Sequence, residues 1–257
     1  MNSLELFKTQ KFYQIDISIL KDLGYDVLLS NRIFDSLLFW KYDILFSYFY
    51  RYSFFAALLA KCFGKKTYFT GGIDSLDSDY ASAFNYKIQA LFFKLCYWVA
   101  DSCIIVSQSD LKNIFKVSSL KKKLSYSEHV INTKLFIADV PKEKIFTSIV
   151  WMGDEGNVVR KGVDKALQIF AELKKIPEFV DYRFVIIGRK GEGEVLVRSI
   201  IDKYNLKGSV ELKGEVSEED KINLLKQSKY YFQLSLYEGF GLAALEACLL
   251  YTSDAAD

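Results

Sequence analysis

The sequence is poor in histidine and proline, with one His and two Pro among 257 residues. Its four cysteines, at positions 62, 96, 103 and 248, are scattered and show no CxxC spacing. This pattern does not indicate a disulfide-built scaffold or a cysteine zinc site, so a reducing cytoplasm is the expected compartment. The scarcity of histidine also disfavours chemistry that needs several imidazole acids and bases.

Long apolar runs and an excess of one charge are missing as well. The longest uncharged run of the most apolar region, residues 52–60, is far shorter than the roughly 20 residues of a membrane-spanning helix. Residues 1–10 lack the pattern of a signal peptide, so none is expected. With 34 basic and 32 acidic residues, no global field favours nucleic acid as a partner. The short basic run 121–123 is typical of a solvated surface.

What the chain does contain is a regular alternation of short β-rich runs and helical patterns, with 51% hydrophobic residues. This alternation predicts an α/β protein with parallel sheets. The strands are predicted at 25–29, 42–48, 66–70, 102–107, 146–152, 182–188, 209–214 and 230–235. The helices are predicted at 14–23, 51–63, 80–99, 108–117, 161–175, 193–204, 217–228 and 239–247.

A stretch without periodicity, residues 125–144, separates two α/β halves, which we place at 1–138 and 139–247. In open parallel sheets, ligands bind at the carboxyl ends of the strands. Arg160 and Lys161 follow a strand and are expected in a loop or the first turn of a helix. Two cations there fit a bound diphosphate, and two solvated surface cations fit equally well.

A second post-strand segment, GRKGEGEV (188–195), begins with Gly188 and Arg189. Its glycines let the backbone approach a ligand, although a plain turn explains them about as well. The segment is not GxGxxG and follows a late strand, so a nicotinamide-type fingerprint is not supported.

The stretch YEGFGLAALEA (237–247) carries two carboxylates, Glu238 and Glu246, around a glycine-broken apolar run. In this apolar setting an unpaired carboxylate is costly, which favours a function for both. Eight residues on a helix span about 12 Å, a distance that suits a ligand with hydroxyls at both ends and phosphates between. Gly239, Phe240 and Gly241 would offer backbone N–H groups at the helix start.

These motifs, taken in order, resemble the retaining glycosyltransferases of family 4. EGFGLAALE resembles the E-x7-E motif, VVRKGVDKAL the phosphate-binding lysine–glycine segment, and FVIIGRKGEG the next strand and glycine loop. VELKGEVSEEDKINLLKQS is similar to the nucleotide-contacting loop and helix, and VADSCIIVSQSDLKNIF and VINTKLF to the first-domain strand–helix and the linker. The resemblance covers most of residues 60–247. It implies a GT-B fold, with two Rossmann-like domains facing across a cleft and the second one incomplete.

The resemblance implies a role for each matching residue. Glu238 would contact the donor sugar, Glu246 the ribose, and Lys161, with Arg160, the departing diphosphate. The remaining nucleotide contacts would come from the glycine loops and the loop before the 217–228 helix, namely Gly188, Arg189, Val216, Gly239, Phe240 and Gly241. The donor is a nucleotide-diphosphate sugar, and neither a cofactor nor a metal is expected.

Two positions depart from the family pattern. Many members carry an arginine after the glycine of the first donor-domain strand, whereas here Gly153 is followed by Asp154, and Arg160 is a candidate substitute. Many also have a histidine after the third acceptor-domain strand, where this chain has Asp74. Asp74 either binds a sugar or caps the following turn. The single histidine, His129, is expected to be incidental.

The last ten residues, CLLYTSDAAD (248–257), resemble translated read-through of a sequencing adapter, and we interpret them as a non-native tail. The residues before 25 supply no convincing first strand. Both features predict a gene fragment of an active parent enzyme.

The leading hypothesis is sugar transfer to a cell-envelope glycan or lipid-linked acceptor, in the cytoplasm or peripherally at the inner face of the cell membrane. The aromatic, partly basic segment 37–66 fits either contact with a membrane surface or core strand and helix, which the alternation favours. Two alternatives remain: a GT-B-fold nucleotide-sugar epimerase, which the scarcity of histidine disfavours, and a non-catalytic sugar-nucleotide-binding module.

Overall fold

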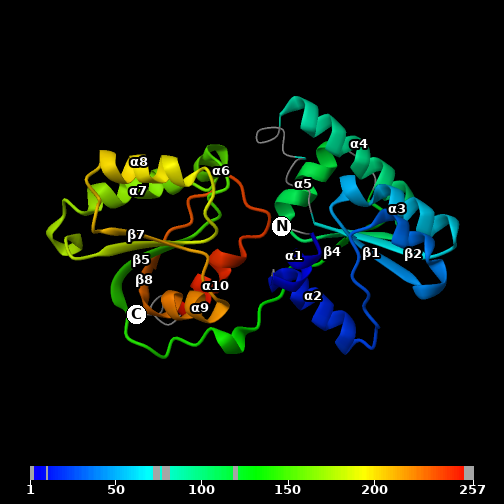
Figure 1. Ribbon diagram of the computed structural model, residues 1–257, viewed down its shortest axis with the longest axis horizontal. Helices are drawn as coiled ribbons and strands as arrows, with labels where there is room; N and C mark the ends of the chain where they lie inside the picture. Colours follow the sequence, from blue (N-terminus) through cyan, green and yellow to red (C-terminus); the bar gives the residue numbers. More distant parts are fainter. Residues whose placement is uncertain (1–2, 10, 72–75, 77–81, 118–120, 252–257) are drawn as a thin grey trace. The chain divides into compact units, whose positions relative to one another are not determined.

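The computed structural model describes residues 3–9, 11–71, 76, 82–117 and 121–251. The chain divides into two compact units, Met1–Val130 and Ile131–Asp257, whereas the predicted division lies at 138/139. Each unit contains a parallel sheet with helices around it, so the predicted α/β class is confirmed (Figure 1).

The first unit is built on a sheet with the strand order β1-β2-β3-β4, in which all neighbours are parallel. Its core is aromatic: Tyr50 of α3 stacks on Phe69 of β2 and packs beside Phe93 of α4. The described elements are α1 (Ser3–Thr9), α2 (Lys11–Asp22), η1 (Ile33–Leu37), η2 (Phe39–Lys41), β1 (Ile44–Tyr48), α3 (Tyr50–Cys62), β2 (Lys66–Thr70), α4 (Ala83–Val99), β3 (Ser102–Ile105), α5 (Gln108–Val117) and β4 (Leu124–Tyr126).

The strand predicted at 25–29 is wrong, because these residues form no regular element. Tyr25, Leu28 and Leu29 are exposed, although the run is apolar enough for a buried strand. A strand forms only where another strand satisfies its backbone N–H and C=O groups, and no described strand pairs with this segment. Conversely, β4 overlaps the start of the stretch 125–144 that is predicted as a linker, because β3 offers it an edge.

The second unit has a sheet of order β7-β6-β5-β8, again parallel throughout. The first strand of this unit therefore lies inside the sheet, between the second and the fourth. The described elements are η4 (Thr133–Leu135), β5 (Glu143–Ile149), α6 (Glu155–Arg160), α7 (Val163–Leu173), η5 (Pro177–Phe179), β6 (Arg183–Ile187), α8 (Glu194–Lys203), β7 (Val210–Gly214), α9 (Glu218–Gln227), β8 (Ser228–Tyr231) and α10 (Leu242–Tyr251).

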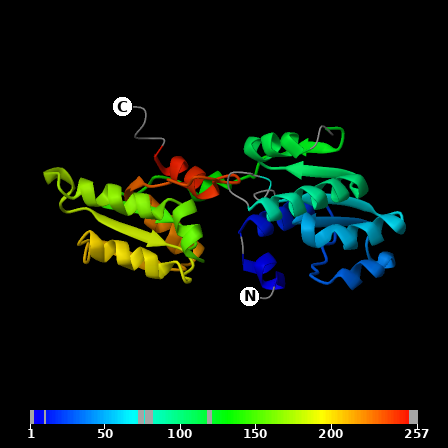
Figure 2. The ribbon, with the colours of Figure 1, turned by 90° about the horizontal axis from the view of Figure 1, so that it is seen from above.

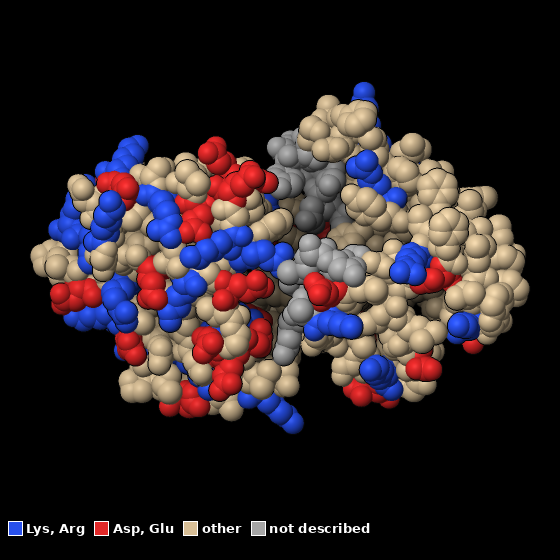
Figure 3. All heavy atoms as spheres, viewed as in Figure 1, with Lys and Arg blue, Asp and Glu red and all other residues tan. Residues whose placement is uncertain are grey.

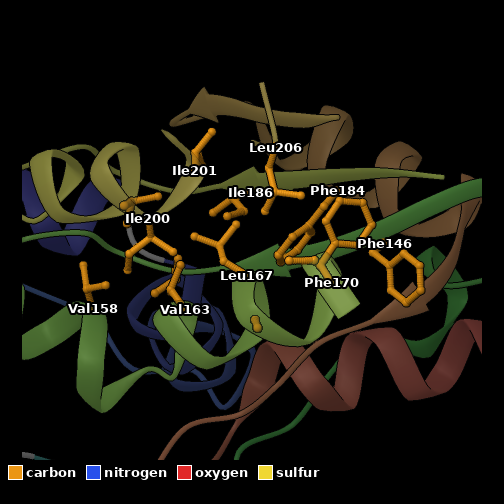
Figure 4. Close-up of a cluster of buried hydrophobic side chains, with 14 of the residues drawn as sticks. Phe146, Val158, Val163, Leu167, Phe170, Phe184, Ile186, Ile200, Ile201 and Leu206 are labelled. Carbon is orange, nitrogen blue, oxygen red and sulfur yellow. The ribbon is translucent and has the colours of Figure 1, made fainter. Parts of the chain in front are cut away.

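Helices cover both faces of this second sheet. On one face α7 and α8 run side by side and bury a cluster that includes Phe146, Leu167 and Phe184 (Figures 1, 2 and 4). On the other face α9 and α10 pack through Leu225 and Leu250 against the sheet. Burying each such large side chain contributes about 1.5–3 kcal/mol. Packing on both faces thus fixes the strand ends from which the loops at the carboxyl edge emerge.

No helix within the described residues is both long and apolar enough to cross a bilayer.

Candidate active site

A short helix that the sequence pattern does not predict, α6, positions the two cations after β5. Asp154 caps its start, because Oδ1 accepts the backbone N–H of Asn157 at 2.7 Å. This explains the aspartate after Gly153. Arg160 is the last residue of α6, so the prediction of a loop or first turn is wrong for it; its charge lies at the favourable, negative end of the helix dipole. Lys161 is the C-cap.

Lys161 contacts Glu238 directly, although 77 positions separate them in the chain. Its Nζ lies 2.6 Å from Glu238 Oε1, and the two side chains are 20% and 26% exposed. Gln233 Nε2 and Ser235 Oγ donate to the same oxygen, at 2.6 and 2.7 Å. No donor from the described residues reaches the other oxygen, Oε2. Glu238 is therefore held through Oε1, and its second carboxylate oxygen keeps its capacity to accept hydrogen bonds.

Contacts with main-chain atoms hold the segment around Lys161 against the loop that carries Glu238. Leu236 N–H donates to the Arg160 carbonyl at 2.8 Å, and the Arg160 guanidinium donates to the Tyr237 carbonyl at 3.3 Å. Gly162, with φ +68°, lies so close to the backbone of Leu234 that a Cβ at this position would be 2.1 Å from the Leu234 carbonyl oxygen. The Lys161–Glu238 contact therefore depends on backbone geometry as well as on charge.

The strand order explains why these loops meet. Lys161 follows β5 and Glu238 follows β8, and the two strands are neighbours in the sheet. The helices after β5 pass to one face and α10, after β8, packs on the other (Figure 1). A place where the connections change from one face of an open parallel sheet to the other is a topological switch point, and open parallel sheets bind ligands there. Lys161 and Glu238 stand at the carboxyl edge of this switch point.

Glu246 has a different partner from Glu238. It lies on α10, is buried, and its Oε2 is 2.7 Å from Lys221 Nζ of α9. Lys221 also lies 2.9 Å from Glu218 Oε1. Burial of Glu246 therefore does not by itself require a ligand, contrary to the sequence-based argument. Because α10 begins at Leu242, the predicted helical span from Glu238 to Glu246 is also wrong. The role of Glu246 at a ribose stays a prediction.

The glycines after β6 are required by the protein itself. A Cβ at Gly188, where φ is +132°, would lie 1.9 Å from the Val150 carbonyl oxygen. Cβ atoms at Gly191 and Gly193 would meet the backbone after β5 at 2.5–2.6 Å. The close approach in the structure is thus between the β5 and β6 loops, whereas the sequence predicts an approach to a ligand. A contact of Gly188 with a nucleotide stays a prediction.

The other predicted residues lie around the same edge or outside it. Arg189 Nε is 3.7 Å from Glu215 Oε2, and its guanidinium lies 6.0 Å from the Trp151 ring centre. Val216 packs into the cluster beneath α9. The three residues between Glu238 and α10 are partly buried and non-helical: Gly239, Phe240 and Gly241, the last with φ +80°. Asp74 falls outside the described residues.

Three residues of the site are not predicted from the sequence: Gln233, Ser235 and Lys221. Gln233 and Ser235 follow the end of β8, two residues apart, which is the only local signal for them. Lys221 has none, since its i, i+3 spacing from Glu218 is that of an ordinary surface pair. His129 is half-buried in the first unit, and burial lowers the pKa of its imidazole.

Residues 156–252 match the family described as "Glycosyl transferases group 1". A 91-residue segment is 35% identical to GDP-mannose:cellobiosyl-diphosphopolyprenol alpha-mannosyltransferase of Xanthomonas oryzae pv. oryzae (strain PXO99A), and covers 35% of this chain and 23% of that protein. A 90-residue segment is 33% identical to a component of the phosphatidylinositol N-acetylglucosaminyltransferase of Homo sapiens, covering 35% and 18%. The matches thus span less than a quarter of these relatives.

Solved structures show the same fold. HepE of Anabaena, in complex with UDP and glucose, has a TM-score of 0.68 at 14% identity, over 91% of this chain and 68% of that chain. Sucrose-phosphate synthase from Thermosynechococcus elongatus has a TM-score of 0.63 at 18% identity, over 82% and 54%. These neighbours are GT-B glycosyltransferases, so the predicted fold class, two Rossmann-like parallel-sheet units, is confirmed.

Proposed function

From the premise that residues 156–252 match the Glycosyl transferases group 1 family, we propose that this protein is a retaining, family 4 glycosyltransferase. It transfers a sugar from a nucleotide-diphosphate sugar to a cell-envelope glycan or a lipid-linked acceptor. The names of the two curated relatives support this acceptor class, since one names a diphosphopolyprenol and the other a phosphatidylinositol. We place the reaction in the cytoplasm, either away from the membrane or peripherally at the inner face of the cell membrane.

The observation that carries the proposal is the Lys161–Glu238 contact at the switch point. When the bond between the anomeric carbon and the diphosphate breaks, negative charge develops on the departing diphosphate oxygens. A lysine ammonium has three N–H donors, and only one is needed for Glu238 Oε1. The other two stabilise the diphosphate charge, as preorganised donors do at a leaving group.

Glu238 supplies the other half of the donor site. Its Oε1 is occupied by Lys161, Gln233 and Ser235, so Oε2 accepts hydroxyl groups of the transferred sugar. Glu246, which Lys221 holds on α10, accepts from the ribose hydroxyls. Arg160 fixes the Tyr237 carbonyl and so orients the Glu238 loop.

The first test measures nucleoside diphosphate binding by calorimetry. Charge-assisted hydrogen bonds contribute about 1.5–3 kcal/mol each, so Lys161→Met should weaken UDP or GDP binding about 10- to 100-fold. The matched control is Lys175→Met, because Lys175 also pairs with a glutamate, Glu172, at 2.6 Å but is solvent-exposed. Equal affinity of the two variants would refute the role of Lys161.

The second test separates an enzyme from the two alternatives. Glu238→Ala should abolish sugar transfer from a panel of nucleotide sugars while nucleoside diphosphate still binds. Unchanged turnover would reject the role of Glu238. Conversion of the donor sugar without transfer would support an epimerase, and binding without any turnover of wild-type protein would support a non-catalytic module. Nuclear magnetic resonance of the product anomer tests retention.

A further inference from the structure

The outer face of α4 in the first unit carries large apolar side chains that contact water. One side of this helix is buried through Phe93, Cys96 and Tyr97. On the opposite side Phe84, Leu91 and Trp98 are 73%, 55% and 71% exposed. They are seven residues apart, so they line up along one face over about 21 Å. A row of large, exposed apolar side chains along one helix face is typical of an interaction surface.

Two lysines lie in the same line as these apolar residues. Lys87 and Lys94 follow Phe84 and Leu91 by three positions, and both are exposed. Neither forms an ion pair or a hydrogen bond with any residue that the structure describes. The helix Ala83–Val99 contains no Asp or Glu. We call the five residues Phe84, Lys87, Leu91, Lys94 and Trp98 the α4 stripe.

A second basic group adjoins the end of this stripe. Lys123 Nζ donates to the carbonyls of Tyr97 and Trp98, at 3.1 and 2.9 Å, and so caps the C-terminus of α4. Lys121 and Lys122, which precede it, are exposed. The basic run of the sequence is therefore placed beside Trp98. On the face seen in Figure 3, the first unit, at the right, exposes broader areas without charged residues than the second unit does.

We propose that the α4 stripe binds the surface of an anionic lipid bilayer. Trp, Phe and Leu insert at the level of the headgroups, and the lysine stems extend their ammonium groups toward lipid phosphates. Each lysine near an anionic membrane contributes about 1 kcal/mol of attraction. The inference does not depend on sugar transfer.

The chemistry of the stripe disfavours a protein partner. Lysine is depleted in the cores of protein interfaces, whereas here it lies between the apolar residues. A second copy of the chain would meet the stripe through the same surface, because two-fold contacts are self-complementary. That contact would bring Lys87 and Lys94 against lysines, with no carboxylate on either helix. An anionic bilayer meets no such repulsion.

Fluorescence of single tryptophans tests the proposal, because the chain has only Trp40, Trp98 and Trp151. The variant W40F/W151F leaves Trp98, and W98F/W151F leaves Trp40, which is also exposed (66%) and lies in segment 37–66. With phosphatidylcholine–phosphatidylglycerol vesicles that contain brominated acyl chains, Trp98 should shift to the blue and be quenched, and Trp40 should not. Quenching of Trp40 alone, or of neither, would overturn the proposal.

Vesicle flotation tests the charge component. K87Q/K94Q should weaken binding to mixed vesicles about 25-fold, about fivefold for each lysine. The control K165Q/K175Q removes two exposed lysines of α7 and the residues after it, with the same change in net charge, and should bind like wild type. An equal loss in the control would show that only overall charge attracts the protein. Analytical ultracentrifugation without lipid measures whether the protein forms a dimer. A dimer whose stability changes in K87Q/K94Q would show that the α4 stripe binds a second copy of the chain instead of a bilayer. Circular dichroism confirms that each variant is folded.

Discussion

Gly162 is the position at which a single methyl group should separate the two halves of the candidate site. It follows Lys161, has φ +68°, and lies against the backbone of Leu234. A Cβ there would be 2.1 Å from the Leu234 carbonyl oxygen, about 1.3 Å short of the 3.4 Å at which ordinary contact begins. Because the contact is with backbone, no rotation of a side chain relieves it.

The expected cost of Gly162→Ala has two parts. A non-glycine residue in the left-handed region costs about 1–2 kcal/mol, partly offset by about 0.4–1 kcal/mol from the stiffer unfolded chain. Displacing packed backbone adds about 1–3 kcal/mol, as overpacking does elsewhere. The free energy of unfolding should therefore fall by about 2–4 kcal/mol.

Gly208→Ala is the matched control. Gly208 lies in the same unit and has φ +81°, but a Cβ there would meet nothing within 4 Å. Only the backbone strain applies, so the loss should be about 0.5–1.5 kcal/mol. Urea unfolding should be followed by Trp151 fluorescence in a W40F/W98F background, so that the second unit alone is observed. At a slope of about 2 kcal/mol per molar urea, the two midpoints should differ by about 1 M.

A functional measurement accompanies the stability measurement. Gly162→Ala should also weaken nucleoside diphosphate binding, since it moves the Glu238 loop away from Lys161, whereas Gly208→Ala should not. The reasoning fails if the two variants lose the same stability and bind the nucleotide equally well.

Two further predictions concern the ion pairs. Lys221→Met should lower the free energy of unfolding by about 2–4 kcal/mol, because Glu246 then remains buried without its cation, and K221M/E246Q should recover part of the loss in the same urea assay. Burial raises the pKa of Asp101, but the donors from Lys61 and from Thr67 outweigh it and lower that pKa overall. Asp101 therefore stabilises the first unit above its unfolded pKa of about 3.9, and this stability is lost as the pH falls through the lower folded value. The difference in stability between wild type and Asp101→Asn should shrink between about pH 5 and pH 2, and a constant difference would contradict the assignment.

The sequence alone determines the order of the elements and the positions that follow the strands. Apolar alternation and helical periodicity are local properties, so β2 and α5 lie at the residues predicted for them. Lys161 and Glu238 are recognisable from the sequence for the same reason, because each follows a predicted strand. Ligand sites of parallel sheets lie at the carboxyl ends of the strands. The local pattern fails at residues 25–29, where the apolar run has no partner strand.

Only the tertiary structure decides which strands are neighbours. Strand pairing joins residues far apart in the chain, and no local pattern encodes the order β7-β6-β5-β8. That order brings Lys161 within 2.6 Å of Glu238 and lets Gln233 and Ser235 fix one carboxylate oxygen. It also places Lys221 against Glu246, a pairing of two helices on the far face of the sheet. The sequence therefore supplies the charged groups, and the packing of the sheet determines which of them meet.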